Sequence, residues 1–454
     1  MANGSITMME PAEAIDYARS LAREHKEPDA DFLLKRSEEL SVEILNGKVE
    51  KVEQSTSLGL GLRVVRDGRT GLAYTERLAP GPIEAAFHAA RENAALPDAT
   101  EVVMNREPAA VPDPAGLELY NPDLEALTLD DLARFGLEAE AAAKAADPRV
   151  KTVPDMIVSR NSGSYLVASP HGLSYGQRSN SVSAYCSVLM EENGQLKSGG
   201  KSWRRRAWDA AQGAVLGREA VEECAVLLGA KSIPGGRMPI VLDQWVAPRL
   251  LGMYMGNFSA ESAQKGVSRL KGRLGETIAG TDLSLVDDPH RVGASGSRYL
   301  DVEGIATRPL PLIENGVFTN FLYHIESARK AGVESTGHAG RGYTGGISTR
   351  THNLVLEPGP HDLDALCAIP ERCLLVTRLE GGAGCNPISG DISIGVQGFL
   401  VEGGERKQAV DSVTIAGNFY HLLNNIQALG DAYQPNLTSM FIPGMLLDGI
   451  TVSG

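Results

Sequence analysis

Residues 40–53 have the sequence LSVEILNGKVEKVE, in which apolar and polar residues alternate on both sides of Asn46-Gly47. Alternation with a period of two predicts half-buried β-strands, and Asn-Gly between two such runs predicts a tight hairpin turn. The same pattern continues through 58–64 and, after Asp67-Gly68, into 70–74. We therefore expect an antiparallel meander of about four strands near the N-terminus.

Helical patterns flank this meander, and more strands follow it. Apolar residues recur at helical spacing over 11–24, and a second helix is expected at 82–95. Thr128 to Asp131 resembles a capping box that begins a helix ending near Ala146. Further helices are expected at 207–230, 323–331 and 419–429, a strand-rich stretch at 156–208, strands at 238–242, 373–379, 391–401 and 413–417, and a proline-rich linker at 108–122.

The strands rarely alternate one-for-one with helices, so a doubly wound parallel sheet is not expected. The predicted fold class is α+β, with an N-terminal antiparallel sheet and flanking helices, followed by a β-rich C-terminal domain with a few helices. We expect an N-terminal α+β domain at 1–106, a middle strand and helix region at 107–232 that packs with it, and the C-terminal domain at 233–454.

Composition narrows the classes of partner. The chain has 454 residues, and 43 Lys and Arg against 57 Asp and Glu give a formal net charge of −14. A field of this sign repels phosphate backbones and anionic membrane surfaces, so neither nucleic acid nor membrane is expected as a partner. No secretory signal is visible, and five scattered cysteines do not resemble a disulfide framework. We therefore expect a cytoplasmic protein.

Two motifs allow both a ligand-binding and a structural interpretation. Residues 340–345 (GRGYTG) satisfy G-x-G-x-x-G, but a dinucleotide site needs a strand before the motif and a helix after it. Here a helix precedes and a strand-like segment follows, which favours a plain glycine loop. Residues 202–208 (SWRRRAW) could seat a carboxylate or a phosphate, or form a solvated edge strand; the edge strand is favoured.

The spacing of the histidines and cysteines shows whether the sequence contains a recognisable metal-binding motif. His324, His338, His352 and His361 are spaced 14, 14 and 9 residues apart, and the sequence has no H-E-x-x-H, C-x-x-C or H-x-H. The sequence does not exclude a zinc site assembled from distant segments, but it does not favour one. The loop 335–341 (STGHAGR) could contact a ligand through its histidine and arginine, or be a structural turn.

Several stretches of the chain match a known family in their order. They are NGKVEKVE at 46–53, GLGLRV at 59–64, SARKAG at 327–332, STGHAG at 335–340, SGD at 389–391 and TIAGN at 414–418. Each is weak alone, but together, from about Asp29 to the C-terminus, they resemble the TldD/PmbA family of metalloproteases and its PmbA (TldE) branch in particular.

The resemblance implies a heterodimer of two related subunits. In the TldD subunit an H-E-x-x-x-H helix and a later cysteine bind the metal, and the glutamate can act as general base on a metal-bound water. Matched by eye, that helix falls at 250–257, where the histidine positions hold Gly252 and Asn257 and the glutamate position holds Met253. The cysteine position falls near Val396. The chain thus resembles the subunit that lacks the metal-binding motif.

The function implied is that of the non-metal-binding subunit of a TldD/TldE-type heteromeric metallopeptidase, which forms part of the peptide-binding chamber. Such an enzyme degrades unfolded proteins or trims modified precursor peptides. No catalytic residue and no cofactor is expected in this chain, and zinc is expected in the partner subunit. Two alternatives remain: a stand-alone peptide-binding scaffold or homodimer, and a cysteine hydrolase that uses Cys385. The candidate substrate or interface residues are His338, Arg341, Asn257 and Met253.

Overall fold

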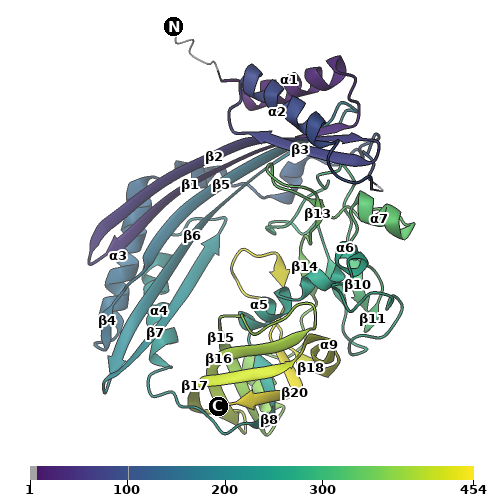
Figure 1. Cartoon of the computed structure of the whole chain (residues 1–454). Helices are drawn as coiled ribbons and strands as arrows, with labels where there is room; N and C mark the ends of the chain where they lie inside the picture. The colour runs from purple at the N-terminus through teal and green to yellow at the C-terminus, as the bar shows by residue number, and fades with distance from the viewer. Residues whose placement is uncertain (1–7, 101) are drawn as a thin grey trace.

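The computed structural model describes residues 8–100 and 102–454. It contains the hairpin predicted near the N-terminus. β1 (Ala30–Leu45) and β2 (Lys48–Arg66) pair antiparallel along their whole length (Figure 1). Asn46 and Gly47 have φ of 54° and 75°, the left-handed conformation that two-residue hairpin turns favour. With β3 (Arg69–Thr75), the meander has three strands rather than four, because the runs predicted at 48–53 and 58–64 are one strand.

This hairpin belongs to a larger antiparallel sheet. Among the described residues, seven strands form it in the order β3-β2-β1-β5-β6-β4, with β7 paired to β6. The additional strands are β4 (Val150–Thr152), β5 (Met156–Ala168), β6 (Ser174–Glu192) and β7 (Gln195–Arg205). The predicted α+β class with an N-terminal antiparallel sheet is confirmed.

Helices cover the two ends of this sheet and leave its middle open (Figure 1). α1 (Pro11–Glu24) and α2 (Pro80–Asn93) pack over Phe32 and Leu62 at one end. α3 (Leu129–Ala146) and α4 (Gln212–Ala225) form a second core with Val42, Ile44 and Val158 at the other end. Between the two cores, the mostly polar residues 35–40 and 54–57 are exposed or half-buried, because no helix of the described chain covers them.

The C-terminal region is β-rich, as predicted. In the described chain β8, β15, β16, β17 and β20 form a closed ring, since β17 pairs with both β16 and β20; β18 is attached to β20. These strands are β8 (Gly236–Leu242), β15 (Arg372–Glu380), β16 (Asp391–Glu402), β17 (Glu405–Asn418), β18 (Ile426–Leu429) and β20 (Met445–Ser453). A second sheet has the order β11-β10-β9-β14-β19. Its strands are β9 (Leu285–Asp287), β10 (Leu310–Glu314), β11 (Val317–Phe318), β14 (Leu354–Leu356) and β19 (Met440–Phe441).

Short elements complete this region. They are the hairpin β12 (Ala339–Gly340) and β13 (Ser348–Thr349), the helices α5 (Val246–Gly252), α6 (Ala260–Gln264), α7 (Ile325–Ala331), α8 (Leu363–Ala368) and α9 (Phe419–Leu422), and the 3-10 turns η3 (Met255–Phe258) and η4 (Leu423–Asn425). No helix in the described ranges has the length and apolar character needed to cross a membrane.

Some predicted elements differ in the structure. The helix expected over 419–429 ends at Leu422, and Ile426–Leu429 is a strand because Ile426 pairs with Leu447 of β20. The expected linker contains the 3-10 turn η1 (Pro114–Leu117), and a second 3-10 turn, η2 (Pro122–Ala126), begins at its last residue. Leu117 and Leu124 are fully buried there, so this segment is packed against the body of the protein.

The long sheet and the C-terminal region meet directly. Leu33, on the face of β1 opposite the helices, packs in one cluster with Val302 and Ala339 of the C-terminal region. The loop between β12 and β13 lies on β2, where a Cβ on Gly61 would stand 2.2 Å from the carbonyl oxygen of Tyr343. Glycine at this position therefore permits a backbone approach that any side chain would block.

Candidate functional site

The segment matched to the metal-binding helix is a short helix followed by a 3-10 turn. α5 begins after Asp243, whose carboxylate accepts hydrogen bonds from the backbone N–H groups of Trp245 and Val246. The helix ends at Gly252, and the 3-10 turn η3 starts at Met255. This break agrees with the sequence, because Gly252 and Gly256 each disfavour a helix by about 1 kcal/mol relative to alanine.

The matched positions carry packing residues. Asn257 is 3% exposed; its amide donates to the carbonyl oxygens of Tyr254 and Pro387, both at 2.9 Å, and accepts from the Tyr420 hydroxyl at 2.9 Å. The Cε methyl carbon of Met253 lies against Gly382, 3.3 Å from the position that a Cβ on this glycine would take. Thus Met253 and Asn257 lie under the loop 381–390, which joins β15 to β16.

Val396 lies elsewhere, as a fully buried residue within β16 that pairs with Leu379 and Val413. Zinc takes thiolate, imidazole and carboxylate ligands. The side chains at the four matched positions include none of these, so they do not fit a zinc ion. Within residues 8–100 and 102–454 no three His, Cys, Asp or Glu side chains are grouped to hold a metal.

Cys385 lies in the same covering loop and is partly buried against the C-terminal core. Its backbone N–H donates to the Gly382 carbonyl oxygen at 3.0 Å, and its thiol neighbours the Tyr254 hydroxyl. Burial, with a smaller effect of that thiol, raises the pKa of Tyr254. No hydrogen bond joins Cys385 to a histidine in the described part of the chain, so the cysteine hydrolase alternative has no visible base and is not favoured.

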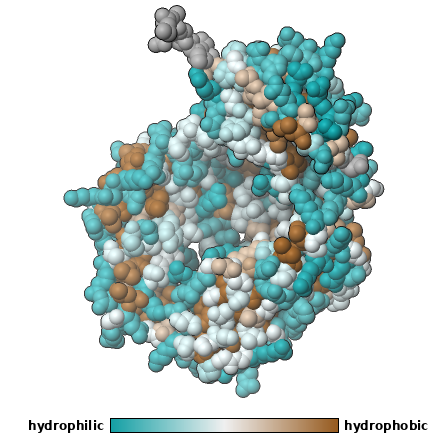
Figure 2. Space-filling model, viewed as in Figure 1, coloured by the Kyte–Doolittle hydropathy of each residue, from teal (hydrophilic) through white to brown (hydrophobic). Residues whose placement is uncertain are grey.

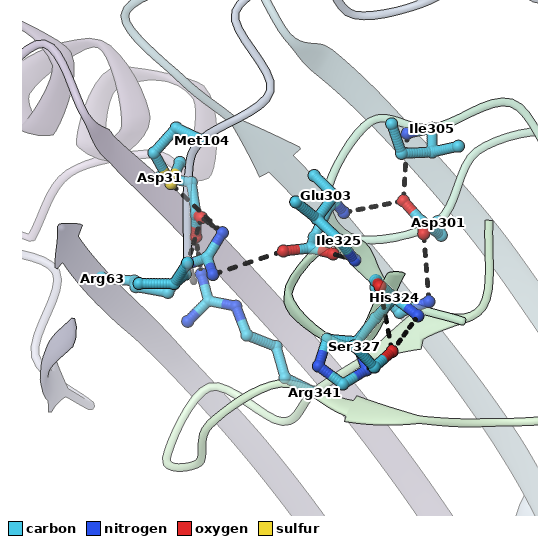
Figure 3. Close-up of polar contacts among 12 residues, drawn as sticks. Asp31, Arg63, Met104, Asp301, Glu303, Ile305, His324, Ile325, Ser327 and Arg341 are labelled. Atoms are coloured by element: carbon cyan, nitrogen blue, oxygen red, sulfur yellow. Dashed lines mark hydrogen bonds and ion pairs between the residues drawn. The ribbon is translucent and has the colours of Figure 1, made fainter. Parts of the chain in front are cut away.

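Arg341 is enclosed by the chain itself rather than exposed on a loop. Figure 3 shows it beside Asp31 and Arg63, with the Asp31 carboxylate between the two guanidinium groups. Arg63 Nε donates to Asp31 Oδ2 at 2.6 Å, and Arg63 Nη1 lies 3.5 Å from Glu303 Oε1. Burial raises the pKa of Glu303 to about 7, although the charge of Arg63 opposes this shift. The network ties β1 and β2 to the C-terminal region.

His338 is also fully buried, next to His352 and Asp287. Its Nε2 lies 3.4 Å from Asp287 Oδ2, and its Nδ1 is 2.8 Å from the Thr336 hydroxyl. The backbone N–H of His352 donates to the Asp287 carboxylate, and its Nε2 lies 2.9 Å from the Gly337 carbonyl oxygen. Burial lowers the pKa of His352 to about 3. The structure thus gives His338 and Arg341 internal partners, and their contact with a substrate stays a prediction.

The surface that the sequence did not single out lies across the open middle of the sheet. A pocket of about 420 Å³ is lined there mostly by hydroxyl and amide side chains, such as those of Ser57 and Asn161, and by Leu437 of the C-terminal region. Glu38 and Glu39 also line it, as do two arginines, Arg204 and Arg206. Figure 2 shows the molecule hollowed on this face, with hydrophilic and neutral residues around the hollow. The available signal was the loss of apolar alternation in the middle of β1 and β2.

A larger cavity of about 840 Å³ adjoins this pocket and shares Arg206 and Leu437 with it. Arg205 and Arg206, from the basic stretch at 202–208, line the cavity together with Arg291. β7 has β6 as its strand partner, as the edge-strand interpretation expected. The same stretch nevertheless faces a cavity, so the ligand interpretation also remains.

Known proteins resemble this chain over nearly its full length. Models of the PmbA/TldA metallopeptidase family match it in three parts: domain 1 at 30–94, the central domain at 122–228 and the C-terminal domain at 235–454. The metalloprotease PmbA of Escherichia coli O157:H7 is 29% identical over 444 residues, covering 96% of each chain.

Solved structures also resemble this chain over nearly its full length. A Thermotoga maritima protein, described as a candidate modulator of a DNA gyrase, superimposes with a TM-score of 0.86 at 28% identity, covering 97% of this chain and 100% of that one. TldE from Thermococcus kodakarensis has a TM-score of 0.83 at 24% identity, covering 96% and 100%, and supports the fold alone. With family models matched along all three parts of the sequence, the chain belongs to the PmbA/TldD metallopeptidase family.

Proposed function

We propose that this chain is the non-metal-binding subunit of a heteromeric metallopeptidase of the TldD/TldE type. In this assembly a TldD-type subunit carries the zinc ion and the catalytic residues. This chain supplies part of the wall of the peptide-binding chamber. The substrate is a linear peptide, either an unfolded protein segment or a precursor peptide that is trimmed.

The observation that carries the proposal is the packing of α5 and η3. The amide of Asn257 makes its three hydrogen bonds to groups of its own chain, and Met253 is half-buried against the loop at Gly382. These residues support the C-terminal core and leave no ligand set for a catalytic metal. A family member with this arrangement needs a partner for hydrolysis.

The open middle of the long sheet supports a role in holding peptide. Hydroxyl and amide groups line the pocket there, and the strands that carry them have no helix over them. Such groups can hydrogen-bond to an extended peptide backbone without selecting one side chain. The hollow in Figure 2 provides the corresponding space.

The test is reconstitution with the TldD-type subunit of the same organism. We expect the two purified chains to co-elute in size-exclusion chromatography and to cleave an unstructured, fluorogenic peptide together. Each chain alone is expected to be much less active, and metal analysis is expected to find zinc with the TldD-type subunit. Stoichiometric zinc in this chain together with cleavage in the absence of a partner would refute the proposal.

A matched variant separates a structural from a catalytic role of the segment. Asn257→Asp keeps the size of the side chain but removes its donor group. The proposal expects a loss of stability without a specific loss of turnover in the fraction that remains assembled. A complete loss of activity with normal folding and normal assembly would instead assign Asn257 to the active site.

A further inference from the structure

The cavity of about 840 Å³ beside the open sheet concentrates positive charge in an acidic protein. Arg205 and Arg206 come from the end of β7 and the residue after it, and Arg291 comes from the C-terminal region. Within the described ranges none of these three guanidinium groups forms an ion pair with a carboxylate. Glu118 is the acidic residue among those that line the cavity. In a chain with a net charge of −14, this excess of unpaired arginine is unexpected.

The arginines are held in place by neutral groups. Arg206 donates through Nε to the Asn180 carbonyl oxygen at 3.2 Å and through Nη1 to that of Gly293. Arg205 donates to the Arg204 carbonyl oxygen at 2.9 Å and to the Asn436 side-chain oxygen. Burial lowers the pKa of both groups, and the more distant charge of Glu219 opposes this shift at Arg205; arginine stays charged in proteins. Carbonyl oxygens position these cations but do not neutralise them.

Arg291 is positioned differently, by aromatic rings. Its guanidinium lies 4.1 Å from the ring centre of Phe441 and 5.5 Å from that of Tyr433. Cation–π contacts of this kind orient the cation and leave its N–H groups free to bind a carboxylate. The same contacts occupy ring faces on which a nucleic-acid base would stack.

We propose that this cavity binds carboxylate groups of an acidic peptide segment, and that an uncharged continuation of the same peptide extends over the middle of the sheet, where Glu38 and Glu39 disfavour further negative charge. The cavity shares Arg206 and Leu437 with the pocket of hydroxyl and amide groups, so one extended chain can contact both. Its side-chain or terminal carboxylates lie at the arginines, and its backbone lies along the strands. This site deepens the proposed function, on which it rests, because it names the substrate class as peptide carrying negative charge.

The test measures binding by this chain alone. A fluorescein-labelled Gly/Ser peptide with a run of glutamates is compared, by fluorescence anisotropy, with the same peptide carrying glutamines. We expect the glutamate peptide to bind at least about tenfold more tightly, because hydrogen bonds from arginine to a charged carboxylate are stronger than those to a neutral amide. Added salt is expected to weaken this binding.

Three variants localise the site. Arg291→Gln and Arg205→Gln are each expected to weaken binding of the glutamate peptide about tenfold and to leave the glutamine peptide unchanged. Arg237→Gln removes the same charge from an exposed residue of β8 outside the cavity and is expected to have little effect. Circular dichroism checks that each variant folds; if one does not, the other variant and the comparison of the two peptides still test the site.

Equal affinity for the two peptides, an equal loss in Arg237→Gln, or stronger competition by a thymidine oligonucleotide than by the unlabelled glutamate peptide would each overturn the proposal. A peptide with an amidated C-terminus separates side-chain from terminal carboxylates. If the glutamate peptide binds but no complex with a TldD-type subunit forms, this site stands and the proposed function fails. If the complex cleaves peptides but shows no preference for acidic ones, this inference alone fails.

Discussion

At the residue scale, the structure separates two kinds of arginine. Arg63 and Arg341 are buried against Asp31 and join the long sheet to the C-terminal region. Arg205, Arg206 and Arg291 face a cavity and have neutral partners. The first group stabilises the chain itself, and the second is available to bind an anion.

Removing Asp31 is expected to be costly. Asp31→Ala leaves two buried guanidinium groups, of which Arg63 keeps its ion pair with Glu303 and Arg341 loses its pair with Asp31. Breaking a buried ion pair from one side costs about 3–5 kcal/mol. Asp29→Ala is the matched control, because Asp29 pairs with the exposed Arg106 and such pairs are worth at most about 1 kcal/mol. Urea unfolding measures both. Similar losses in the two variants would contradict an important role for the buried network.

His352 makes stability depend on pH. Burial lowers the pKa of His352 to about 3, and the charges of His338 and Arg298 act in the same direction while Asp287 opposes them. In the unfolded chain a histidine has its ordinary pKa of about 6.5. Below pH 6.5 the unfolded state therefore binds a proton that the folded state does not. The contribution of the neutral, buried His352 to the free energy of unfolding is complete above pH 6.5 and is lost progressively as the pH falls toward 3.

The measurable result is a difference between two proteins. Between pH 6.5 and 5.5 the original chain should lose about 1 kcal/mol more unfolding free energy than His352→Asn. Taking the difference removes the contributions of other groups, such as Glu303. Urea unfolding at several pH values gives both curves, and parallel curves would show that His352 does not titrate as described.

At the element scale, glycines of β2 allow the β12–β13 loop to lie on the sheet. In Gly61→Ala the new Cβ would meet the Tyr343 backbone at 2.2 Å, so we expect a loss of about 1–3 kcal/mol from overpacking. Gly163→Ala in β5 is the control, because its Cβ would meet nothing nearer than 3.6 Å. Thermal unfolding compares the two, and proteolysis within 341–347 should become faster only in Gly61→Ala. Equal stability of the two variants would argue against close contact.

The N-terminal capping box of α3 is a local feature that the sequence already predicted. The Thr128 hydroxyl accepts from the Asp131 N–H at 3.2 Å, and the Asp131 carboxylate accepts from the Thr128 N–H at 2.9 Å. Thr128→Ala should cost about 1 kcal/mol, whereas Thr128→Ser should retain most of that energy. Chemical denaturation of the three proteins gives the comparison. A serine variant as unstable as the alanine variant would mean that the methyl group, not the hydroxyl, matters.

At the scale of the whole molecule, the segment between β18 and β19 links the C-terminal region to the end of β7. Asn436 accepts from the Arg204 N–H at 3.0 Å and donates to the Ser202 carbonyl oxygen at 3.1 Å, and the Leu437 N–H donates to the Arg204 carbonyl oxygen at 3.0 Å. This link forms one side of the arginine-lined cavity.

Asn436→Ala should therefore loosen the link without unfolding either part. We expect faster amide hydrogen exchange over 433–438 and at β7, with the midpoint of global unfolding nearly unchanged. Asn425→Ala, which removes one exposed hydrogen bond to the His421 carbonyl oxygen, is the control. Unchanged exchange over 433–438 would show that other contacts hold this segment.

Several features were determined by the sequence alone. The helix at 11–24, the Asn46-Gly47 turn and the Thr128 cap agree with the structure, because periodicity, turn chemistry and capping act between near neighbours in the chain. The order of short motifs also pointed to the family. The tertiary structure alone decided that residues 426–429 are a strand, that His338 and Arg341 are enclosed, and that Arg205 and Arg206 meet Arg291 at one cavity. Strand pairing, burial and the gathering of charges depend on segments far apart in sequence, so only the folded chain could reveal them.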